Sequence, residues 1–298
     1  MTDSGRSILT HPARARLFID VQHGLANRMR AMISAASVAQ RTDRDLVVIW
    51  RPDHHCNSTL RDLFVYPGPV IEDDTADLFR RSAAVEYNYV EIEPGAKFLE
   101  PILPDMGKWA GQDVYVRSPE TLRSPHRVFE DEQDFLRKLV PSQAVLNLVS
   151  SVRHPNDVAI HVRMSTGPGF DHLSFEAPSN WPAERHAELT YWRQKSTAAA
   201  FMARLDRLIA EGRADTVFLA ADLASTYDLF AERYGARVNW LARADYDRSV
   251  RQLQYALADM ILLAHANLFL ASTWSSFSDM AQRLARPGRL IEQSGEDF

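Results

Sequence analysis

The first segment whose residue types could do chemistry is Gly24–Arg30, which follows the apolar run Arg16–Val21. Gly24 permits a tight turn and a close approach of the backbone to a ligand. The helix that begins here offers free N–H groups and a partial positive charge, and Arg28 and Arg30 add donors for an anionic or hydroxylated ligand. A plain strand-to-helix turn with solvated arginines fits the same pattern. The segment lacks the ending of a P-loop and the later glycines of a dinucleotide fingerprint.

The second segment, His161-Val162-Arg163, ends another apolar strand. An arginine at this point would face the cleft of an α/β protein, and its guanidinium can hold two phosphate oxygens at once. Alternatively, Arg163 pairs with a nearby carboxylate and His161 is a satisfied core histidine. The loop over 164–182 is long enough to be a lid or a substrate-binding element. The carboxylates and the histidine in or beside this loop that could act as bases are Asp171, His172, Glu176 and Glu184.

The third segment, Leu270–Ser278, again runs from a strand into a helix. Hydroxyls at a helix start can bind phosphate together with the backbone N–H groups, or Ser275 or Ser276 can simply cap the helix. Upstream, Asp222 follows the strand-like run Phe218–Ala221. Its carboxylate could pair with the N1–H and the exocyclic amine of guanine, or it could cap the next helix.

Metal binding has little support in the sequence. His54, His55 and Cys56 are consecutive, and consecutive side chains rarely converge on one ion. No Asp-x-Asp pattern follows a strand, and no Gly-x-Ser-x-Gly elbow indicates a hydrolase.

The elements that must position these segments alternate between strands and helices. A strand over 16–21, a helix over 25–41 and a strand over 46–50 form a βαβ unit, and such units build parallel sheets. The stretch 51–127 is less regular. The other predicted elements are strands at 84–92, 113–117, 158–162, 216–220, 237–240, 268–271 and 290–291, and helices at 130–139, 142–152, 189–211, 224–234, 249–264 and 276–285. The sequence therefore predicts an α/β fold.

Length and composition agree with two domains of this kind. The 298 residues are 46% apolar, enough for two domains of about 150 residues each. Proline and asparagine in Arg153–Asn156 mark a linker, so we expect Rossmann-like domains over 1–154 and 155–298 that face a cleft. The net charge of −5 argues against a general nucleic-acid binder. The single Cys56, the lack of an apolar h-region over 1–16 and the lack of a long apolar run predict a cytoplasmic protein without an integral membrane segment.

Taken in order, these segments resemble the superfamily of GDP-fucose-dependent fucosyltransferases, which includes rhizobial nodulation fucosyltransferases, core α-1,6-fucosyltransferases and protein O-fucosyltransferases. The family's glycine-leucine-x-asparagine turn stands here as Gly24–Arg28, and its His-x-Arg as His161–Arg163. A strand ending in Ala-Thr-Asp-Asp stands as Phe218–Leu223, without the threonine and the second aspartate. A helix with an aspartate, then a strand and a serine pair, stands as Asp259 through Ser275–Phe277.

The resemblance covers 18–64 and 158–284 and is poor over 66–152. It implies a GT-B fold and an inverting, metal-independent glycosyltransferase that moves fucose from GDP-fucose and needs no cofactor. Arg163 would bind the diphosphate and Asp222 the guanine. The residues that would complete the donor site are His161, Ser275, Ser276, Gly24, Asn27 and Arg28. Asp171 would take the proton of the acceptor hydroxyl, with Glu176 and Glu184 as alternatives.

Two other functions fit the same residues. The scaffold could use another nucleotide sugar, or it could be a catalytically inactive nucleotide-sugar binding protein. The acceptor, whether glycan, glycolipid or small molecule, is not encoded in any motif. We also expect a local reversal of the net charge, because Arg28, Arg30, His161 and Arg163 would make one positively charged cleft between the halves.

Overall fold

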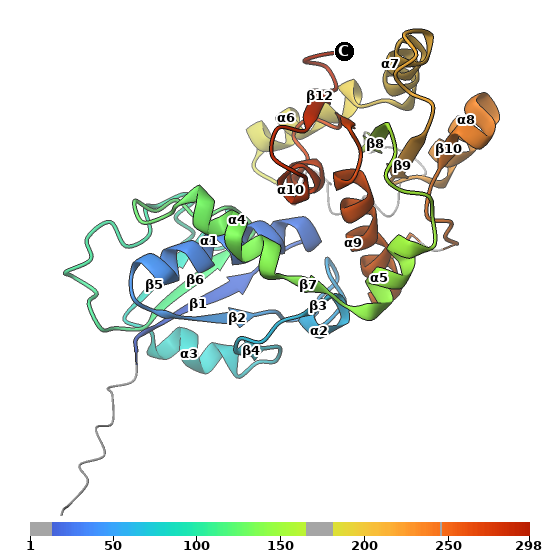
Figure 1. Cartoon of the computed structure of the whole chain (residues 1–298). Helices are drawn as coiled ribbons and strands as arrows, with labels where there is room; N and C mark the ends of the chain where they lie inside the picture. Colours follow the sequence, from blue (N-terminus) through green and yellow to red (C-terminus); the bar gives the residue numbers. More distant parts are fainter. Residues whose placement is uncertain (1–13, 165–180, 245) are drawn as a thin grey trace, which may run out of the picture.

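The computed structural model describes residues 14–164, 181–244 and 246–298. Figure 1 shows two α/β halves side by side, an N-terminal half drawn blue to green and a C-terminal half that begins with the green β8 (Val158–Val162) and continues yellow to red. Each half contains one five-stranded sheet in which every neighbouring pair of strands is parallel. This confirms the predicted α/β class.

The sheet of the N-terminal half has the order β4-β2-β1-β6-β5. Its strands are β1 (Arg16–Val21), β2 (Asp45–Ile49), β4 (Val70–Ile71), β5 (Val85–Asn88) and β6 (Val114–Ser118). Alternate residues of β1 face opposite sides of the sheet. Leu17 and Ile19 pack toward α1 (Leu25–Arg41), whereas Phe18 packs toward α3 (Ala76–Ser82).

The sheet of the C-terminal half has the order β10-β9-β8-β11-β12. Its strands are β8 (Val158–Val162), β9 (Val217–Ala221), β10 (Val238–Asn239), β11 (Leu268–Ala271) and β12 (Leu290–Gln293). One face packs against α7 (Ala198–Ala210) and α8 (Ala224–Tyr234), and the other against α9 (Val250–Ala264) and α10 (Ser276–Leu284). Because both faces are covered, the strands are apolar nearly throughout, which is typical of parallel sheets.

In both sheets the order of the strands changes side at the centre. The first strand of each half, β1 or β8, lies in the middle, and the chain first moves outward on one side. It then crosses to the other side, to the edge strand β5 and back inward to β6 in the N-terminal half, and to β11 and then β12 in the C-terminal half. Ligands of open α/β sheets bind beyond the carboxyl ends of the strands at such a switch point. We therefore expect ligand sites beyond the carboxyl ends of β1 and β6 and of β8 and β11.

The two halves are joined through helices. Two helices end the N-terminal half in the sequence, α4 (Phe129–Lys138) and α5 (Gln143–Ser150). Along the chain between β2 and β4 come α2 (Leu60–Leu63) and β3 (Phe64–Val65). Strand β3 pairs with β7 (Val140–Pro141), which lies between α4 and α5 in the sequence. Helix α10 contacts α1 and α4, and α9 contacts α5. A buried ion pair of 2.7 Å between Glu132 on α4 and Arg283 on α10 crosses this boundary.

The predicted elements hold closely, with one correction. Helices α1 and α8 and strands β1, β8 and β11 have the predicted bounds. The single helix predicted over 189–211 is in fact two, α6 (Ala183–Lys195) and α7. Thr197 caps α7, because its side chain accepts a hydrogen bond of 3.3 Å from the N–H of Ala200. A capping threonine ends one helix and starts another even though the apolar spacing continues.

Candidate functional site

The carboxyl ends of three neighbouring strands carry the centre of the site. Arg163 follows β8, and its Nη1 lies 2.7 Å from Oδ2 of Asp222, which follows β9. The backbone N–H of Arg163 donates to Oγ of Ser272 at 2.8 Å, and that hydroxyl donates to the carbonyl of His161 at 2.8 Å. Ser272 follows β11, so one hydroxyl ties β8 to β11 at the switch point.

Asp222 is held in place from the side of α8. The Tyr227 hydroxyl accepts from the N–H of Ala221 at 2.8 Å and donates to its carbonyl at 3.0 Å, which fixes the last residue of β9. The Asp222 side chain is only 11% exposed, yet its Oδ1 has no hydrogen-bond partner among the described residues. A buried carboxylate oxygen without a donor costs free energy, so such an atom calls for a ligand.

His161 lies beneath this cluster and is buried. Its Nδ1 is 2.8 Å from Oγ of Ser278, and its ring stacks on Phe277 with a centroid distance of 4.6 Å. Burial, and then the guanidiniums of Arg163 and Arg193, lower the pKa of His161 to about 3. The imidazole is therefore neutral at physiological pH and contributes no charge to a ligand. This geometry matches the alternative of a satisfied core histidine.

The start of α10 completes the carboxyl edge of β11. Ser275 is the N-cap, and its hydroxyl accepts from the N–H of Ser278 at 3.4 Å. This confirms that Ser275 caps the helix. Ser276 is the first helical residue, and Trp274 before the cap has a φ of 56°. The N–H groups of the first turn and the positive end of the helix dipole lie at this same strand edge.

Matched substitutions separate capping from ligand binding at these two serines. Ser275→Ala is expected to destabilise the protein by about 1 kcal/mol through loss of the cap, while Ser276→Ala costs little. If both hydroxyls also bind phosphate, both variants weaken GDP binding. Urea unfolding and calorimetric titration with GDP check the two effects. Unchanged GDP affinity in Ser276→Ala would remove that hydroxyl from the site.

The first predicted segment forms the turn between β1 and α1. Gly24 is the residue before the helix, with a φ of −72°, and a Cβ built there would have nothing within 4 Å. The positive φ of the turn belongs to His23, at 63°, so the expectation that the turn needs the glycine is wrong, whereas a close approach of a ligand to Gly24 stays a prediction. Gly24 leaves open space and is not required by the backbone conformation. Next to it, Oδ1 of Asn27 is buried without a hydrogen-bond partner among the described residues.

Arg28 is entirely buried and acts as a clamp in this structure. Its Nε donates to the carbonyl of His23 at 2.8 Å, and its Nη1 donates to the carbonyl of Arg51 at 2.8 Å. Its Nη2 lies 2.8 Å from Oδ2 of Asp53, and its guanidinium stands 5.2 Å from the ring centre of Trp50. Arg28 thus ties the turn after β1 to the loop after β2.

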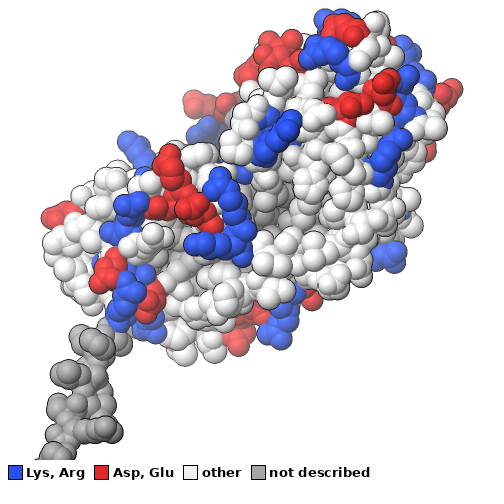
Figure 2. Space-filling model, viewed as in Figure 1, with Lys and Arg blue, Asp and Glu red and all other residues white. Residues whose placement is uncertain are grey.

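The expected positive cleft is not what the described residues form. Arg28 pairs with Asp53, Arg30 pairs with Glu120 at 2.5 Å, and Arg163 pairs with Asp222. His161 is neutral, as described above. Figure 2 shows a hollow between the halves and, on that face, acidic and basic side chains interspersed rather than one field of positive charge. The sequence showed the arginines but not the carboxylates that the fold brings to them.

A buried ion pair beside Tyr227 was not among the predicted site residues. Asp259 on α9 receives two hydrogen bonds from Nη2 of Arg243, at 2.9 and 2.7 Å, and both side chains are 4% exposed. The Arg243 guanidinium lies between the rings of Tyr227 and Tyr255. Burial raises the pKa of Asp259 to about 6, although Arg243 opposes that shift. The sequence signal was the aspartate in the last motif.

The base predicted from the sequence, Asp171, is not among the described residues. His172 and Glu176 are likewise outside the described residues, and Glu184 lies in the first turn of α6. Among the residues described, no group of three or more histidine, cysteine, aspartate or glutamate side chains is placed to hold a metal ion, and His54–Cys56 is no exception. Within the same residues, no helix is long and apolar enough to cross a membrane.

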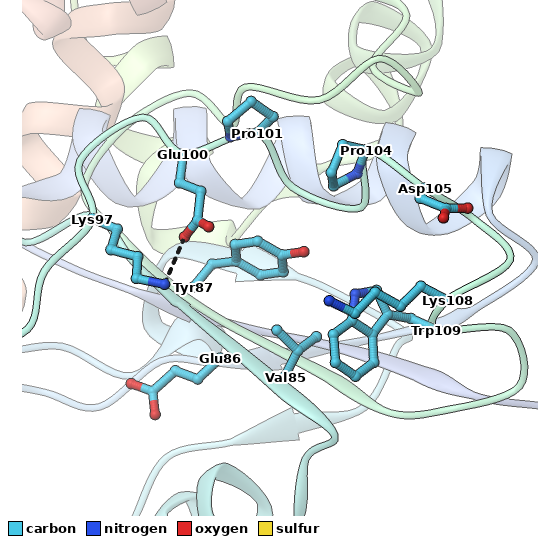
Figure 3. A pocket seen from close by; sticks show the side chains of 10 residues that line it. All are labelled: Val85, Glu86, Tyr87, Lys97, Glu100, Pro101, Pro104, Asp105, Lys108 and Trp109. Carbon is cyan, nitrogen blue, oxygen red and sulfur yellow. Dashed lines mark ion pairs between the residues drawn. The ribbon is translucent and has the colours of Figure 1, made fainter.

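The cavity in Figure 3 is separate from the strand-end site. It has a volume of about 300 Å³ and lies at the amino end of β5, against Val85–Tyr87. Lys97 pairs there with Glu100 at 3.7 Å, and Trp109 closes one side. Strands of a parallel sheet have their amino ends at the edge opposite their carboxyl ends, so this cavity does not open onto the switch point.

Comparison with known proteins gives a fold. No family model and no curated protein matches the sequence. The fucosyltransferase NodZ from Bradyrhizobium superposes with a TM-score of 0.57 at 17% identity, over 92% of this chain and 94% of that chain. POFUT1 in complex with GDP-fucose superposes with a TM-score of 0.57 at 13% identity, over 97% and 99%. A mutant of Arabidopsis thaliana FUT1 in complex with GDP gives 0.53 at 18%, over 94% and 72%.

These matches extend over both halves of the chain. The chain therefore has the GT-B fold of these fucosyltransferases, with two parallel α/β sheets, and the predicted fold class is confirmed.

Proposed function

We propose that this protein transfers fucose from GDP-fucose to a hydroxyl of an acceptor, with inversion and without a metal ion or other cofactor. The observation that carries the proposal is the pair of unsatisfied buried oxygens, Oδ1 of Asp222 and Oδ1 of Asn27. Each belongs to a residue that sequence reasoning assigned to the donor site. Each also lies at a strand-to-helix position where α/β folds bind nucleotides. NodZ soaked with GDP-fucose and POFUT1 in complex with GDP-fucose have the same fold.

In this proposal the donor binds to the C-terminal half. The Asp222 carboxylate, which has one oxygen without a partner among the described residues, accepts from the N1–H and exocyclic amine of guanine, and the Arg163 guanidinium binds the diphosphate. The N–H groups at the start of α10, with Ser275 and Ser276, complete the phosphate site. As the bond between C1 and the β-phosphate oxygen breaks, these groups stabilise the negative charge that develops on the diphosphate.

The N-terminal half supplies the other wall of the cleft and the acceptor side, with the boundary near 154/155. Gly24 leaves room for a ligand, and Asn27 offers an acceptor for a sugar hydroxyl. Arg28 contributes through the turn it holds rather than through a free guanidinium. From the sequence, Asp171 is one candidate for the base. The single cysteine, Cys56, is buried and unpaired, which fits a cytoplasmic, reducing compartment.

Selective stabilisation by nucleotides tests the proposal. A ligand at 100 times its Kd adds about 2.7 kcal/mol to the unfolding free energy, which is a rise in Tm of roughly 4 °C for a chain of this size. We expect this rise with GDP and little or none with UDP or dTDP at equal concentration. Stabilisation by UDP or dTDP instead would favour another nucleotide sugar. GDP binding without any sugar release would favour an inactive binding protein.

Asp222→Asn is the matched variant for guanine recognition. It keeps the size of the side chain and can still accept a hydrogen bond from Arg163, but it replaces the carboxylate that guanine would need. We expect the Tm rise with GDP to fall by more than half. An undiminished rise would place the guanine elsewhere.

A further inference from the structure

Three histidines gather on the N-terminal half beside the start of α1. His23 lies in the turn after β1, and His54 and His55 lie in the loop after β2. The ring centres of His23 and His55 are 5.2 Å apart, and those of His54 and His55 are 4.1 Å apart. We call these three residues the histidine cluster. The function proposed above uses none of them.

The protein builds this cluster with buried polar contacts. Arg28 donates to the carbonyl of His23 and pairs with Asp53. The Asp53 carboxylate in turn accepts from the N–H of His55 at 2.8 Å and of Cys56 at 2.9 Å. One buried guanidinium therefore fixes both loops that carry the imidazoles. Chance surface histidines would not be held in this way.

His23 occupies a left-handed backbone conformation, with a φ of 63°. Such a conformation costs a non-glycine residue free energy and persists where the surroundings enforce it, often at functional sites. Here Arg28 enforces it through the His23 carbonyl. The turn lies just beyond the carboxyl end of β1, at the switch point of its sheet, and the following Gly24 leaves open space beside it.

The charge of Arg30 on α1 acts both on His23 and on the start of α10. This charge acts on the pKa of His23 and also on the pKa of Asp279. Asp279 lies in the first turn of α10, directly after Ser275 and Ser276. Helices α1 and α10 are in contact. His23, just before α1, and the first turn of α10 are therefore both within electrostatic reach of one guanidinium, and the two helices pack together.

We propose that His23 is the catalytic residue that takes the proton of the acceptor hydroxyl. This inference rests on the proposed function. The acceptor oxygen attacks C1 of fucose, and the new C–O bond forms as the bond between C1 and the β-phosphate oxygen breaks. The electron pair of the broken bond leaves with GDP. The hydroxyl proton passes to the unprotonated ring nitrogen of His23 and from there to solvent.

The surroundings of His23 make its imidazole a weak base, which releases an accepted proton readily. Burial, then His55, Arg30 and Arg117, lower the pKa of His23 to about 4, while Asp53 acts in the opposite direction. The ring is therefore neutral above about pH 5 and able to accept a proton, and protonation as pH falls through 4 removes that ability. The acceptor hydroxyl becomes strongly acidic as its oxygen bonds to C1, so a weak base suffices. Turnover should fall near pH 4 and show no step near 6.5.

Hydrolysis of GDP-fucose, with water as the acceptor, tests His23. We compare His23→Asn, in which asparagine tolerates the left-handed conformation, with His54→Asn, whose exposed ring takes no part in the step. His23→Asn should slow fucose release by about 10²-fold or more and leave the Kd for GDP within twofold. His54→Asn should release fucose at the wild-type rate. Added imidazole should restore part of the rate in His23→Gly.

Three results would overturn the inference. One is a wild-type rate in His23→Asn. Another is a loss in His23→Gly that imidazole leaves unchanged. The third is a loss in Asp171→Asn that His23→Asn does not share, which would make Asp171 the base. A wild-type protein that binds no GDP would instead contradict the proposed function itself, and the titration shows this before any rate is measured.

Discussion

Replacing Arg163 with alanine is expected to slow fucose release from GDP-fucose by about 10²- to 10³-fold, the effect of removing one preorganised donor to a developing oxyanion. The expectation follows from the position of Arg163 at the end of β8, beside the start of α10 and at the switch point of the C-terminal sheet. GDP should also bind more weakly, because a charge-assisted contact to the diphosphate is lost. Rates of fucose release and calorimetric titration with GDP measure the two effects.

Arg163→Lys is the matched control, since it keeps the charge and removes the planar fork. It should recover part of the GDP affinity and little of the rate. Arg163→Ala also leaves Asp222 buried without its cation, so its Tm should fall whatever the role of Arg163 in binding. A lower Tm with an unchanged Kd for GDP would show that Arg163 is only a partner of Asp222.

Replacing Arg28 with methionine is expected to destabilise the protein by about 3 to 5 kcal/mol, as when one member of a buried ion pair is removed. The side chain is fully buried, and its loss leaves two backbone carbonyls without their donor and the Asp53 carboxylate without its cation. Urea unfolding measures the change in free energy. The turn at His23 and the loop at Asp53 should become the regions with the fastest amide exchange.

Arg30→Met is the control for that experiment. Arg30 lies two residues further along α1 and pairs with Glu120, but its side chain is 20% exposed. Its replacement should cost clearly less than that of Arg28. Equal costs for the two variants would contradict the clamp that we assign to Arg28.

Features that depend on neighbouring residues in the sequence, such as helix bounds and residues at strand ends, were predicted best. Regular apolar spacing predicted α1 and α8 with the observed bounds, because an amphipathic helix carries its period in its own residues. The rule that ligands bind beyond the carboxyl ends of parallel strands then brought Arg163, Asp222 and Ser275 to one edge. The structure places all three residues at that edge.

Contacts between side chains from distant parts of the chain could not be predicted from the sequence. The role of Arg28 depends on Asp53 and on the Arg51 carbonyl, which belong to the irregular loop after β2. No spacing rule predicts the course of such a loop. The prediction of a positively charged cleft was wrong for the same reason, because the fold pairs each of these arginines with a carboxylate.

The break between α6 and α7 shows a competition between two local signals. Apolar spacing continues across Ser196 and Thr197, whereas the threonine favours a new cap. Tertiary contact supports the break, since the Ser196 hydroxyl lies 2.7 Å from that of Ser294 near the C-terminus. His23 was missed because nothing in its neighbours signals a left-handed histidine in the turn.

Release of free sugar from a set of nucleotide sugars shows directly whether the protein acts on GDP-fucose, because the assay needs no acceptor. The set is GDP-fucose, GDP-mannose, UDP-glucose and dTDP-rhamnose, each incubated with the wild-type protein and with Arg163→Ala. We expect the wild type to release fucose from GDP-fucose, Arg163→Ala to be at least about 10²-fold slower, and the UDP and dTDP donors to stay intact. Sugar release from a UDP or dTDP donor, with GDP-fucose left intact, would contradict the proposed function.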